Sequence, residues 1–300
     1  VGDELGEGGD VGRHVLTGRG HRHGGPGGAD GLPHPAVGEV QPEQRVELGL
    51  FVGVGLGGCT REPFTEGDSG PRPQPLDLPG KAGLAHGGFE AVHVKGAGAI
   101  AKAAAAAGVT SLVHVSALGA DAESESGYGR SKALGEAAVR AAFPKATILR
   151  PSVIFGPEDG FLNRFAGMLG LPVVPGVAPK TKFQPVYVVD VARAIAAAAC
   201  EPGLHAGKTV SLGGPDVLTM RALLEWLAET TGRNPTFVDV PDAVAGLLAR
   251  LTGWLPGAPL TSDQWTMLQS DNVVPEGAPG LAALGVDATP MAAVAPGWLV

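Results

Sequence analysis

The stretch SLVHVSALGADAESESGYGRSKALGEAAVRAAFPKATILRP, residues 111–151, decides the fold class. Its apolar run at 111–117 predicts a buried strand, and the segment 127–143 has apolar residues at helical spacing before Pro144. A second apolar run follows this proline. Upstream, an alanine-rich stretch predicts a helix that ends at Gly108. Helix, strand, helix and strand with short connections indicate an α/β fold, a parallel sheet that is wrapped by helices.

Helix signals dominate the last third of the chain. Thr219 and Gly232 stand where the N-cap and the C′ residue of one helix are expected, and Thr261 and Gln264 have the spacing of a capping box. We therefore predict a domain over residues 89–200 that contains the sheet, followed by a smaller, mostly helical C-terminal lobe over residues 201–300.

Residues 1–88 differ in composition from the rest. Glycine fills 18 of the first 60 positions, and the chain has no lysine before Lys81, no isoleucine before Ile100 and no tyrosine before Tyr128. Such a composition predicts loops or disorder. It is also what GC-rich DNA yields when it is read out of frame. Our hypothesis is that residues 1–88 are a frameshifted or misannotated translation, so that the N-terminal βα units of the fold are missing or aberrant.

Composition and charge restrict the function. A net charge of -8 over 300 residues argues against a nucleic-acid partner, and no apolar run is long enough for a transmembrane segment. Cys59 and Cys200 make neither a disulfide framework nor a metal set, so a reducing compartment is expected. No metal site is predicted. The first residues lack the layout of a secretory signal, which favours a cytoplasmic protein.

Tyr128 and Lys132 are the sharpest candidates for chemistry. At i and i+4 they share one helix face, where an ammonium beside a phenol stabilises phenolate and lowers the tyrosine pKa. A tyrosine tuned in this way can pass a proton to or from a substrate oxygen. Ser116, at the end of the preceding strand, has a hydroxyl that could hold the same oxygen. The alternative is a surface tyrosine and a solvated lysine.

Several segments, in this order and spacing, resemble the extended and atypical short-chain dehydrogenase/reductase superfamily, which includes the NAD-dependent epimerases and dehydratases. They are LVHVSALGA, YGRSK, LRPSVIFGP and FQPVYVVDVARAI. Three further segments resemble its complex I accessory-subunit branch, the NDUFA-nine type: FEAVHVKGAGAIAKAAAAAGVT, SALGADAESESGYGRSK and MLQSDNVV. The resemblance covers residues 89–300. His93 stands where sugar-nucleotide epimerases usually have asparagine.

The resemblance implies a Rossmann-type doubly wound parallel sheet. It also implies a cofactor, NAD or NADP, and residues that serve it. Ser116, Tyr128 and Lys132 fall on the family's catalytic serine, tyrosine and lysine, and Lys132 would also bond the nicotinamide ribose. The sites that line the nicotinamide in the family fall on Pro151, Ser152 and Val153.

Asp190 falls on a position that anchors a loop beside the site in the family. We favour a simpler interpretation, in which Asp190 is the N-cap of the helix that follows it.

The glycines Gly6, Gly9 and Gly12 have the spacing of a dinucleotide-binding loop, and they align with the family's glycine pattern. They would let the backbone approach a pyrophosphate at a helix N-terminus. However, the segments on either side make a poor strand and a poor helix, so an accidental glycine spacing is the alternative. A rival glycine motif at 53–58 lies too near Tyr128 to leave room for the intervening strands and helices.

Two functions remain open. The first is an NAD(P)-binding protein that is associated with respiratory complex I as an accessory or quinone-related subunit and is peripheral to the inner membrane through that complex. The second is a free NAD(P)-dependent oxidoreductase or sugar-nucleotide epimerase or dehydratase that uses Ser116, Tyr128 and Lys132.

Overall fold

The computed structural model describes residues 52–55, 88–253, 255 and 260–299, all within one compact unit. Four strands form the main sheet in the order β1-β2-β3-β8: β1 (Val52–Gly55), β2 (Ser111–Val115), β3 (Thr147–Pro151) and β8 (Thr209–Leu212). The strands β2, β3 and β8 are parallel, with Val113 opposite Thr147 and Leu149 opposite Val210. The predicted parallel pairing of the runs on either side of α2 (Gly127–Ala142) is confirmed.

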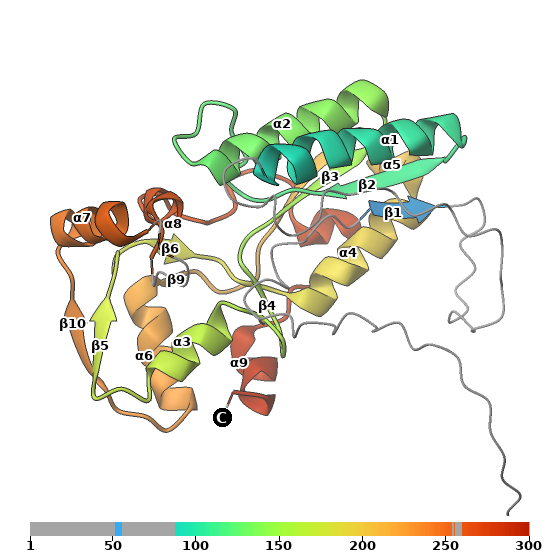
Figure 1. Cartoon of the computed structure of the whole chain (residues 1–300). Helices are drawn as coiled ribbons and strands as arrows, with labels where there is room; N and C mark the ends of the chain where they lie inside the picture. The colour runs from blue at the N-terminus through green and yellow to red at the C-terminus, as the bar shows by residue number, and fades with distance from the viewer. Residues whose placement is uncertain (1–51, 56–87, 254, 256–259, 300) are drawn as a thin grey trace, which may run out of the picture. The chain divides into compact units, whose positions relative to one another are not determined.

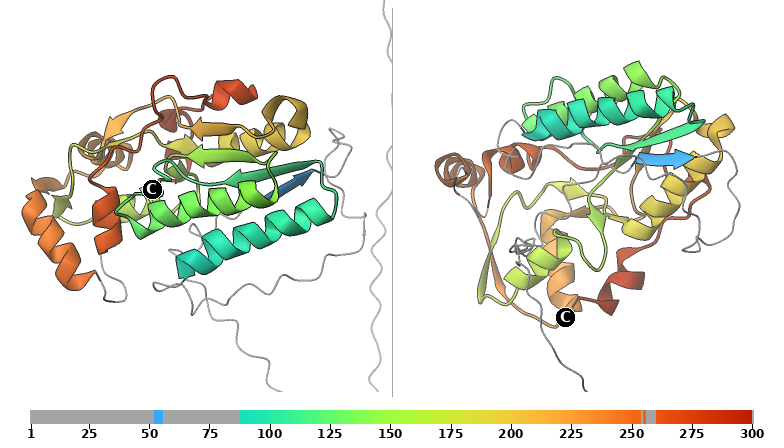
Figure 2. Two further views of the ribbon diagram at one scale, coloured as in Figure 1. Left: turned by 90° about the horizontal axis from the view of Figure 1, so that it is seen from above. Right: turned by 45° about the vertical axis from the view of Figure 1, so that its right-hand side comes forward.

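Helices cover both faces of this sheet, as Figures 1 and 2 show. On one face lie α2 and a helix whose first part, η3 (Glu90–Gly96), is π-helical before it continues as α1 (Ala97–Ala106). The other face is covered by α4 (Val188–Cys200).

The strand residues alternate between two cores. Leu112 and Ile148 pack toward α1 and α2, whereas Val113 and Leu149 pack toward α4. A strand that is covered on both faces has no side that faces solvent, and all five residues of SLVHV are buried, including the polar Ser111 and His114. The doubly wound α/β architecture is confirmed.

The local signals for helix ends are confirmed as well. Gly108 and Gly232 have positive φ angles of 68° and 64°, the left-handed conformation of a C′ glycine. The Thr219 side chain caps the next helix by accepting from the N–H of Ala222, and Thr261 forms the predicted capping box with Gln264.

The strand β1 departs from a fully parallel sheet, since it pairs antiparallel with β2. It occupies part of the rival glycine motif, so Gly53 and Gly55 are strand residues opposite Val113 and Ser111. Most of residues 1–88, including Gly6, Gly9 and Gly12, lie outside the described residues. The glycine loop and the out-of-frame hypothesis therefore stay predictions.

A smaller lobe, which draws on segments both before and after residue 200 and is called the lobe or C-terminal lobe from here on, contains short strands and helices. Its strand pairs are β4 (Ile154–Phe155) with β7 (Val186–Tyr187), β5 (Val173–Gly176) with β10 (Thr236–Asp239), and β6 (Lys182–Phe183) with β9 (Leu218–Thr219). Its helices are α3 (Leu162–Met168), α6 (Met220–Thr230), α7 (Asp242–Thr252), α8 (Ser262–Met267) and α9 (Met291–Val294). The remaining turns are α5 (Pro202–His205), η4 (Leu281–Leu284) and η5 (Ala295–Gly297).

This lobe has its own apolar core, in which Phe155 and Leu162 pack with Leu223 and Leu227 of α6. Chain segments on both sides of residue 200 contribute to it, and β8 belongs to the main sheet. The division into 89–200 and 201–300 stays a prediction.

Within the lobe, α7 packs through its small residues. Ala245 and Ala249 are buried, and a Cβ atom on Gly246 would lie 2.9 Å from the Trp265 indole nitrogen. The larger side chains point outward: Val244 and Leu247 are 54% and 59% exposed. Within the described ranges, the helix thus presents an exposed apolar face.

Candidate functional site

The candidate site begins where β2 ends. Ser116 follows the strand directly, and its backbone N–H donates to the Leu149 carbonyl at 2.7 Å, which fixes it against β3. Its side chain is 3% exposed, and its hydroxyl has no hydrogen-bond partner among the described residues. A buried hydroxyl without a partner costs free energy unless a ligand supplies one. The carboxyl ends of parallel strands are where open α/β sheets bind ligands.

Tyr128 and Lys132 lie in the first turns of α2, above this strand end. The Lys132 ammonium is 5.7 Å from the centroid of the Tyr128 ring and donates to the Val115 carbonyl at 3.4 Å. Lys132 is only 5% exposed, so the alternative of a solvated lysine is wrong. The positive charge is held next to the phenol ring at the end of β2, while the roles of Ser116, Tyr128 and Lys132 in catalysis stay a prediction.

A wall of rings packs beside Tyr128. The His93 ring lies edge-on to it, with centroids 5.6 Å apart, and Phe89 stacks on His93 at 5.3 Å. His93 Nδ1 is 2.8 Å from the Ser131 hydroxyl, which in turn donates to the Tyr128 carbonyl at 2.8 Å. Since that hydroxyl gives its proton to the carbonyl, it accepts from His93, which assigns the proton to Nδ1.

Both buried histidines near Lys132 are neutral at neutral pH. Burial, together with the positive charge of Lys132, lowers the pKa of His93 from 6.5 to about 4. The same two causes, in the same order, lower the pKa of His114 to about 4, although the Glu136 carboxylate opposes them. Lys132 is therefore the cation of this cluster, and the histidines add no charge to it.

The loop after β3 forms the second side of the site. The Pro151 carbonyl accepts from the Leu118 N–H at 2.9 Å, so this loop lies against the loop that follows Ser116. The structure thus brings together the predicted residues of both loops. The Ser152 hydroxyl is buried and donates to Asn272 Oδ1 at 2.6 Å, and the Val153 N–H donates to the same oxygen at 3.2 Å.

The sequence did not indicate two residues that hold the sides of the site, Asn272 at the loop after β3 and Asp263 at the start of α2. Asp263 accepts from the N–H of Gly127 at 2.6 Å, at the start of α2. Both partners lie more than a hundred positions away, and no local pattern indicates such a contact. The segment MLQSDNVV, which contains Asn272, was singled out only for its resemblance.

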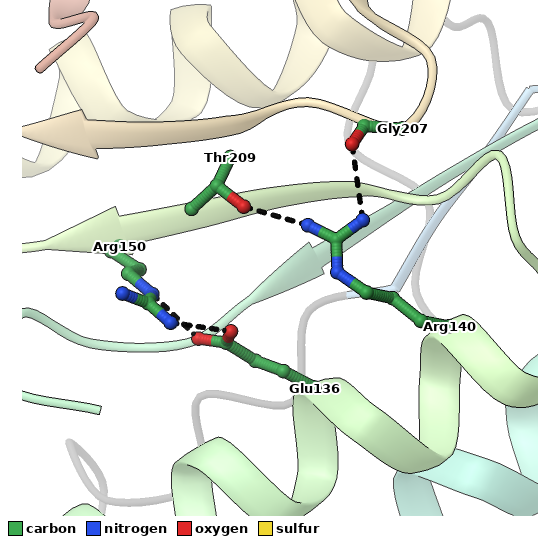
Figure 3. Close-up of polar contacts among 5 residues, drawn as sticks. All are labelled: Glu136, Arg140, Arg150, Gly207 and Thr209. Atoms are coloured by element: carbon green, nitrogen blue, oxygen red, sulfur yellow. Dashed lines mark hydrogen bonds and ion pairs between the residues drawn. The ribbon is translucent and has the colours of Figure 1, made fainter. Parts of the chain in front are cut away.

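Two further side chains fix α2 on the sheet, as Figure 3 shows. The buried Glu136 carboxylate accepts two hydrogen bonds from Arg150 of β3, at 2.8 and 2.7 Å, and raises the arginine pKa. One turn further on, Arg140 donates to the Gly207 carbonyl at 3.0 Å and to the Thr209 hydroxyl at 2.6 Å. The helix that carries Tyr128 and Lys132 is thereby tied to β3 and β8.

The prediction that Asp190 is an N-cap is wrong. The helix α4 already starts at Val188, so Asp190 is its third residue and is fully buried. Its carboxylate accepts from the Thr289 N–H at 2.7 Å and from the Thr289 hydroxyl at 3.1 Å. Asp190 therefore anchors a C-terminal segment on α4, a contact across 99 positions that local reasoning could not find.

The residues at the end of β2 fit the nicotinamide half of a dinucleotide. An unpartnered buried hydroxyl on Ser116 and a buried ammonium on Lys132 are donors for the hydroxyl groups of a ribose or a carbonyl oxygen. The glycines predicted to face the pyrophosphate lie outside the described residues, so the fit concerns this half alone.

Residues 86–209 match the family model of the RmlD substrate binding domain. The chain is 41% identical over 206 residues to the mouse NADH dehydrogenase [ubiquinone] 1 alpha subcomplex subunit 9, mitochondrial. This alignment covers 68% of this chain and 54% of the mouse protein. It is 33% identical over 156 residues to a ceramide reductase of Caulobacter vibrioides, and this alignment covers 52% of this chain and 49% of the reductase. The chain thus spans about half the length of these curated relatives.

Solved structures share the fold. An NADPH-dependent quinone oxidoreductase of Escherichia coli, solved with NADPH, superposes with a TM-score of 0.55 over 72% of each chain at 23% identity. A triphenylmethane reductase of Citrobacter gives a TM-score of 0.54 at 21% identity, over 68% of this chain and 69% of that one. Within the ranges that the structure describes, no helix has the length and apolar character needed to cross a membrane.

Proposed function

We propose that this chain binds NAD or NADP and acts as an accessory subunit of an NADH:ubiquinone oxidoreductase of the complex I type. The chain belongs to the extended short-chain dehydrogenase/reductase superfamily. The observation that carries this proposal is the 41% identity over 206 residues with a subunit of the mouse alpha subcomplex. The proposed location is cytoplasmic and peripheral to the inner membrane, through the other subunits.

Lys132 would hold the nicotinamide ribose, and the backbone of Pro151, Ser152 and Val153 would line the nicotinamide ring. Gly6, Gly9 and Gly12 would face the pyrophosphate. A bound nicotinamide supplies hydride chemistry. In the accessory function the residues of this chain only bind and orient it, so the phenol of Tyr128 serves as packing beside His93.

The exposed apolar face of α7 supports association with other subunits. Val244, Leu247 and Leu248 stand at helical spacing on one side and are all exposed, while the small residues face inward. A helix that presents apolar side chains at i, i+3 and i+4 fits a groove on a partner protein. We assign this face to a neighbouring subunit of the complex, because the mouse relative is named as a subunit of such an assembly.

A free oxidoreductase or epimerase is the second candidate function. It is favoured by the arrangement at the end of β2, where a buried ammonium lies beside the Tyr128 ring and a buried hydroxyl lacks a partner. The ammonium would lower the tyrosine pKa, and the phenol would then transfer a proton to or from a substrate oxygen. The identity with the Caulobacter ceramide reductase also favours it.

Two substitutions separate these functions in the full chain. We expect Lys132→Ala to weaken the binding of NADH or NADPH, measured by calorimetry, by about tenfold or more, because the buried ammonium is lost. Tyr128→Phe keeps the ring and should leave nucleotide affinity unchanged in both functions. In an enzyme it should also lower kcat by about 10² to 10⁴.

The matched control is Lys180→Ala, because Lys180 is exposed and lies in the lobe. A chain that binds neither NADH nor NADPH contradicts the proposal, and so does an equal affinity of the Lys132→Ala and Lys180→Ala variants. Turnover that Tyr128→Phe abolishes would favour the second candidate.

A further inference from the structure

Both walls of the nicotinamide site are held by one short segment of the C-terminal lobe. The first wall is the start of α2, which carries Tyr128, and the second is the loop at Ser152 and Val153. Asp263 reaches the first wall from α8, and Asn272 reaches the second a few residues later. Neither residue belongs to the set that the resemblance assigns to the cofactor or to catalysis.

Asp263 completes the N-terminus of α2. The first N–H groups of a helix have no acceptor within the helix, and a negative charge there is stabilised by the helix dipole. Ser126 is the N-cap and accepts from the Gly129 N–H. The carboxylate of Asp263 accepts from the Gly127 N–H at 2.6 Å, from the Ser126 hydroxyl at 3.1 Å and from the Tyr128 N–H at 3.4 Å. The backbone of Tyr128 itself is thus held by the lobe.

Asn272 acts on the second wall as an acceptor. Its Oδ1 accepts from the Ser152 hydroxyl and from the Val153 N–H. Its backbone is fixed in turn against β6 and the residue that follows it: its N–H donates to the Lys182 carbonyl at 2.8 Å, and its carbonyl accepts from the Gln184 N–H at 3.0 Å and from the Ser152 hydroxyl at 3.1 Å. The side chain is therefore presented to the loop from a rigid position.

We propose that Asp263 and Asn272 are positioning residues that set the two walls of the nicotinamide site against each other. Both act through other groups, Asp263 through the backbone at Tyr128 and Asn272 through Ser152 and Val153. This inference rests on the proposed nucleotide site. It makes the lobe part of the site's construction, because the same short segment carries both contacts.

The first experiment concerns Asn272 in the full chain. Among the described residues, the Asn272 side chain is used through its oxygen, so Asn272→Asp retains this acceptor and Asn272→Ala removes it. Both variants keep the backbone carbonyl that also accepts from the Ser152 hydroxyl. We expect Asn272→Ala to raise the Kd for NADPH about tenfold and to speed amide exchange at Val153, whereas Asn272→Asp stays within about twofold of the unsubstituted chain. The exposed Asn234 of the same lobe gives the control, Asn234→Ala, which should change neither quantity.

The second experiment concerns Asp263. We expect Asp263→Ala to speed amide exchange at Gly127 and Tyr128 and to leave Val153 protected. The control Asp242→Ala removes an exposed carboxylate from the first turn of α7 and should change no exchange rate in α2.

Amide exchange also distinguishes failure of the proposed function from failure of the positioning roles of Asp263 and Asn272. If the unsubstituted chain does not bind NADPH, the proposed function fails, while the exchange rates still test whether these residues hold the walls. Unchanged exchange at Val153 in Asn272→Ala, or at Gly127 in Asp263→Ala, overturns the inference. If Asn272→Ala does not fold, the other two variants decide. Loss of amide protection at Val153 in Asn272→Asp overturns the inference, and so does normal protection at Gly127 in Asp263→Ala.

Discussion

Helix α2 buries polar side chains against the sheet, whereas α7 turns its largest apolar side chains to solvent. On α2, Lys132 and Glu136 are 5% and 6% exposed. On α7, Ala249 is fully buried and Leu247 is 59% exposed. Burying a polar group costs free energy unless it is paired, and an exposed apolar face loses the gain of burial.

The two helices differ in whether these unfavourable groups have partners within the described residues. The polar groups of α2 have partners inside the chain, since Glu136 pairs with Arg150 and Lys132 donates to the Val115 carbonyl. The apolar face of α7, in contrast, stays exposed among the residues that the structure describes. The face of α7 is the one that we propose a neighbouring subunit covers.

The largest expected effect is the loss of stability at acid pH, which tests the buried polar side chains near α2. His93 and His114 have pKa values near 4 in the folded chain, below the ordinary 6.5, so the unfolded chain binds more protons between these values. The stability that these neutral histidines contribute is complete above pH 6.5 and is lost as the pH falls toward 4. We expect the free energy of unfolding to fall by about 2–4 kcal/mol from pH 7 to pH 5, measured by urea titration.

A histidine variant shows whether this loss arises beside α2. His114→Leu removes one titrating group, so the fall between pH 7 and pH 5 should shrink by about half. The slope with pH is compared, not the absolute stability, because the substitution also changes packing. A slope equal to that of the unsubstituted chain would place the effect elsewhere.

The buried ion pair of α2 gives the next largest effect. Glu136→Gln should lower the free energy of unfolding by about 2 kcal/mol, because it removes the carboxylate charge that pairs with Arg150. The effect is limited because Arg150 is partly exposed and can recover some hydration. Its control is Glu225→Gln in the exposed pair with Arg221, which should change stability by less than about 0.5 kcal/mol. Equal effects in the two variants would remove the distinction between buried and exposed pairs.

The face of α7 should matter little to stability and much to association. We expect the double variant Val244→Thr, Leu247→Gln to change the free energy of unfolding by less than about 0.5 kcal/mol, since both side chains are exposed. On native gels it should no longer migrate with NADH:ubiquinone oxidoreductase activity.

The matched control comes from α2. Leu134 is 49% exposed there, and Leu134→Gln should leave the migration unchanged. If the α7 variant still migrates with the activity, or if the unsubstituted chain never does, the assignment of this face fails.

The features that the sequence predicted correctly are mostly local. The cap at Thr219, the capping box at Thr261 and the C′ glycines Gly108 and Gly232 each depend on residues within one turn. The parallel sheet was also predictable, because parallel strands need a long crossover connection and a helix joins these two apolar runs.

The contacts that build the site were not predictable in the same way. Asp190 was assigned a local cap, although its partner Thr289 lies 99 positions away, and the contacts of Asp263 and Asn272 span 136 and 120 positions. The antiparallel pairing of β1 is another such case, since a single strand carries no signal of its partner's direction. Sequence patterns indicate which elements form, and tertiary packing decides which side chains meet.

Stabilisation by nucleotide tests the central claim most directly. In the full chain, NADH or NADPH at a hundred times its Kd should raise the free energy of unfolding by about 2.7 kcal/mol. At that same concentration, Lys132→Ala should lose much of this gain, and the α7 double variant should retain it in full. No stabilisation of the unsubstituted chain by either nucleotide, or an equal gain in Lys132→Ala, would contradict the account.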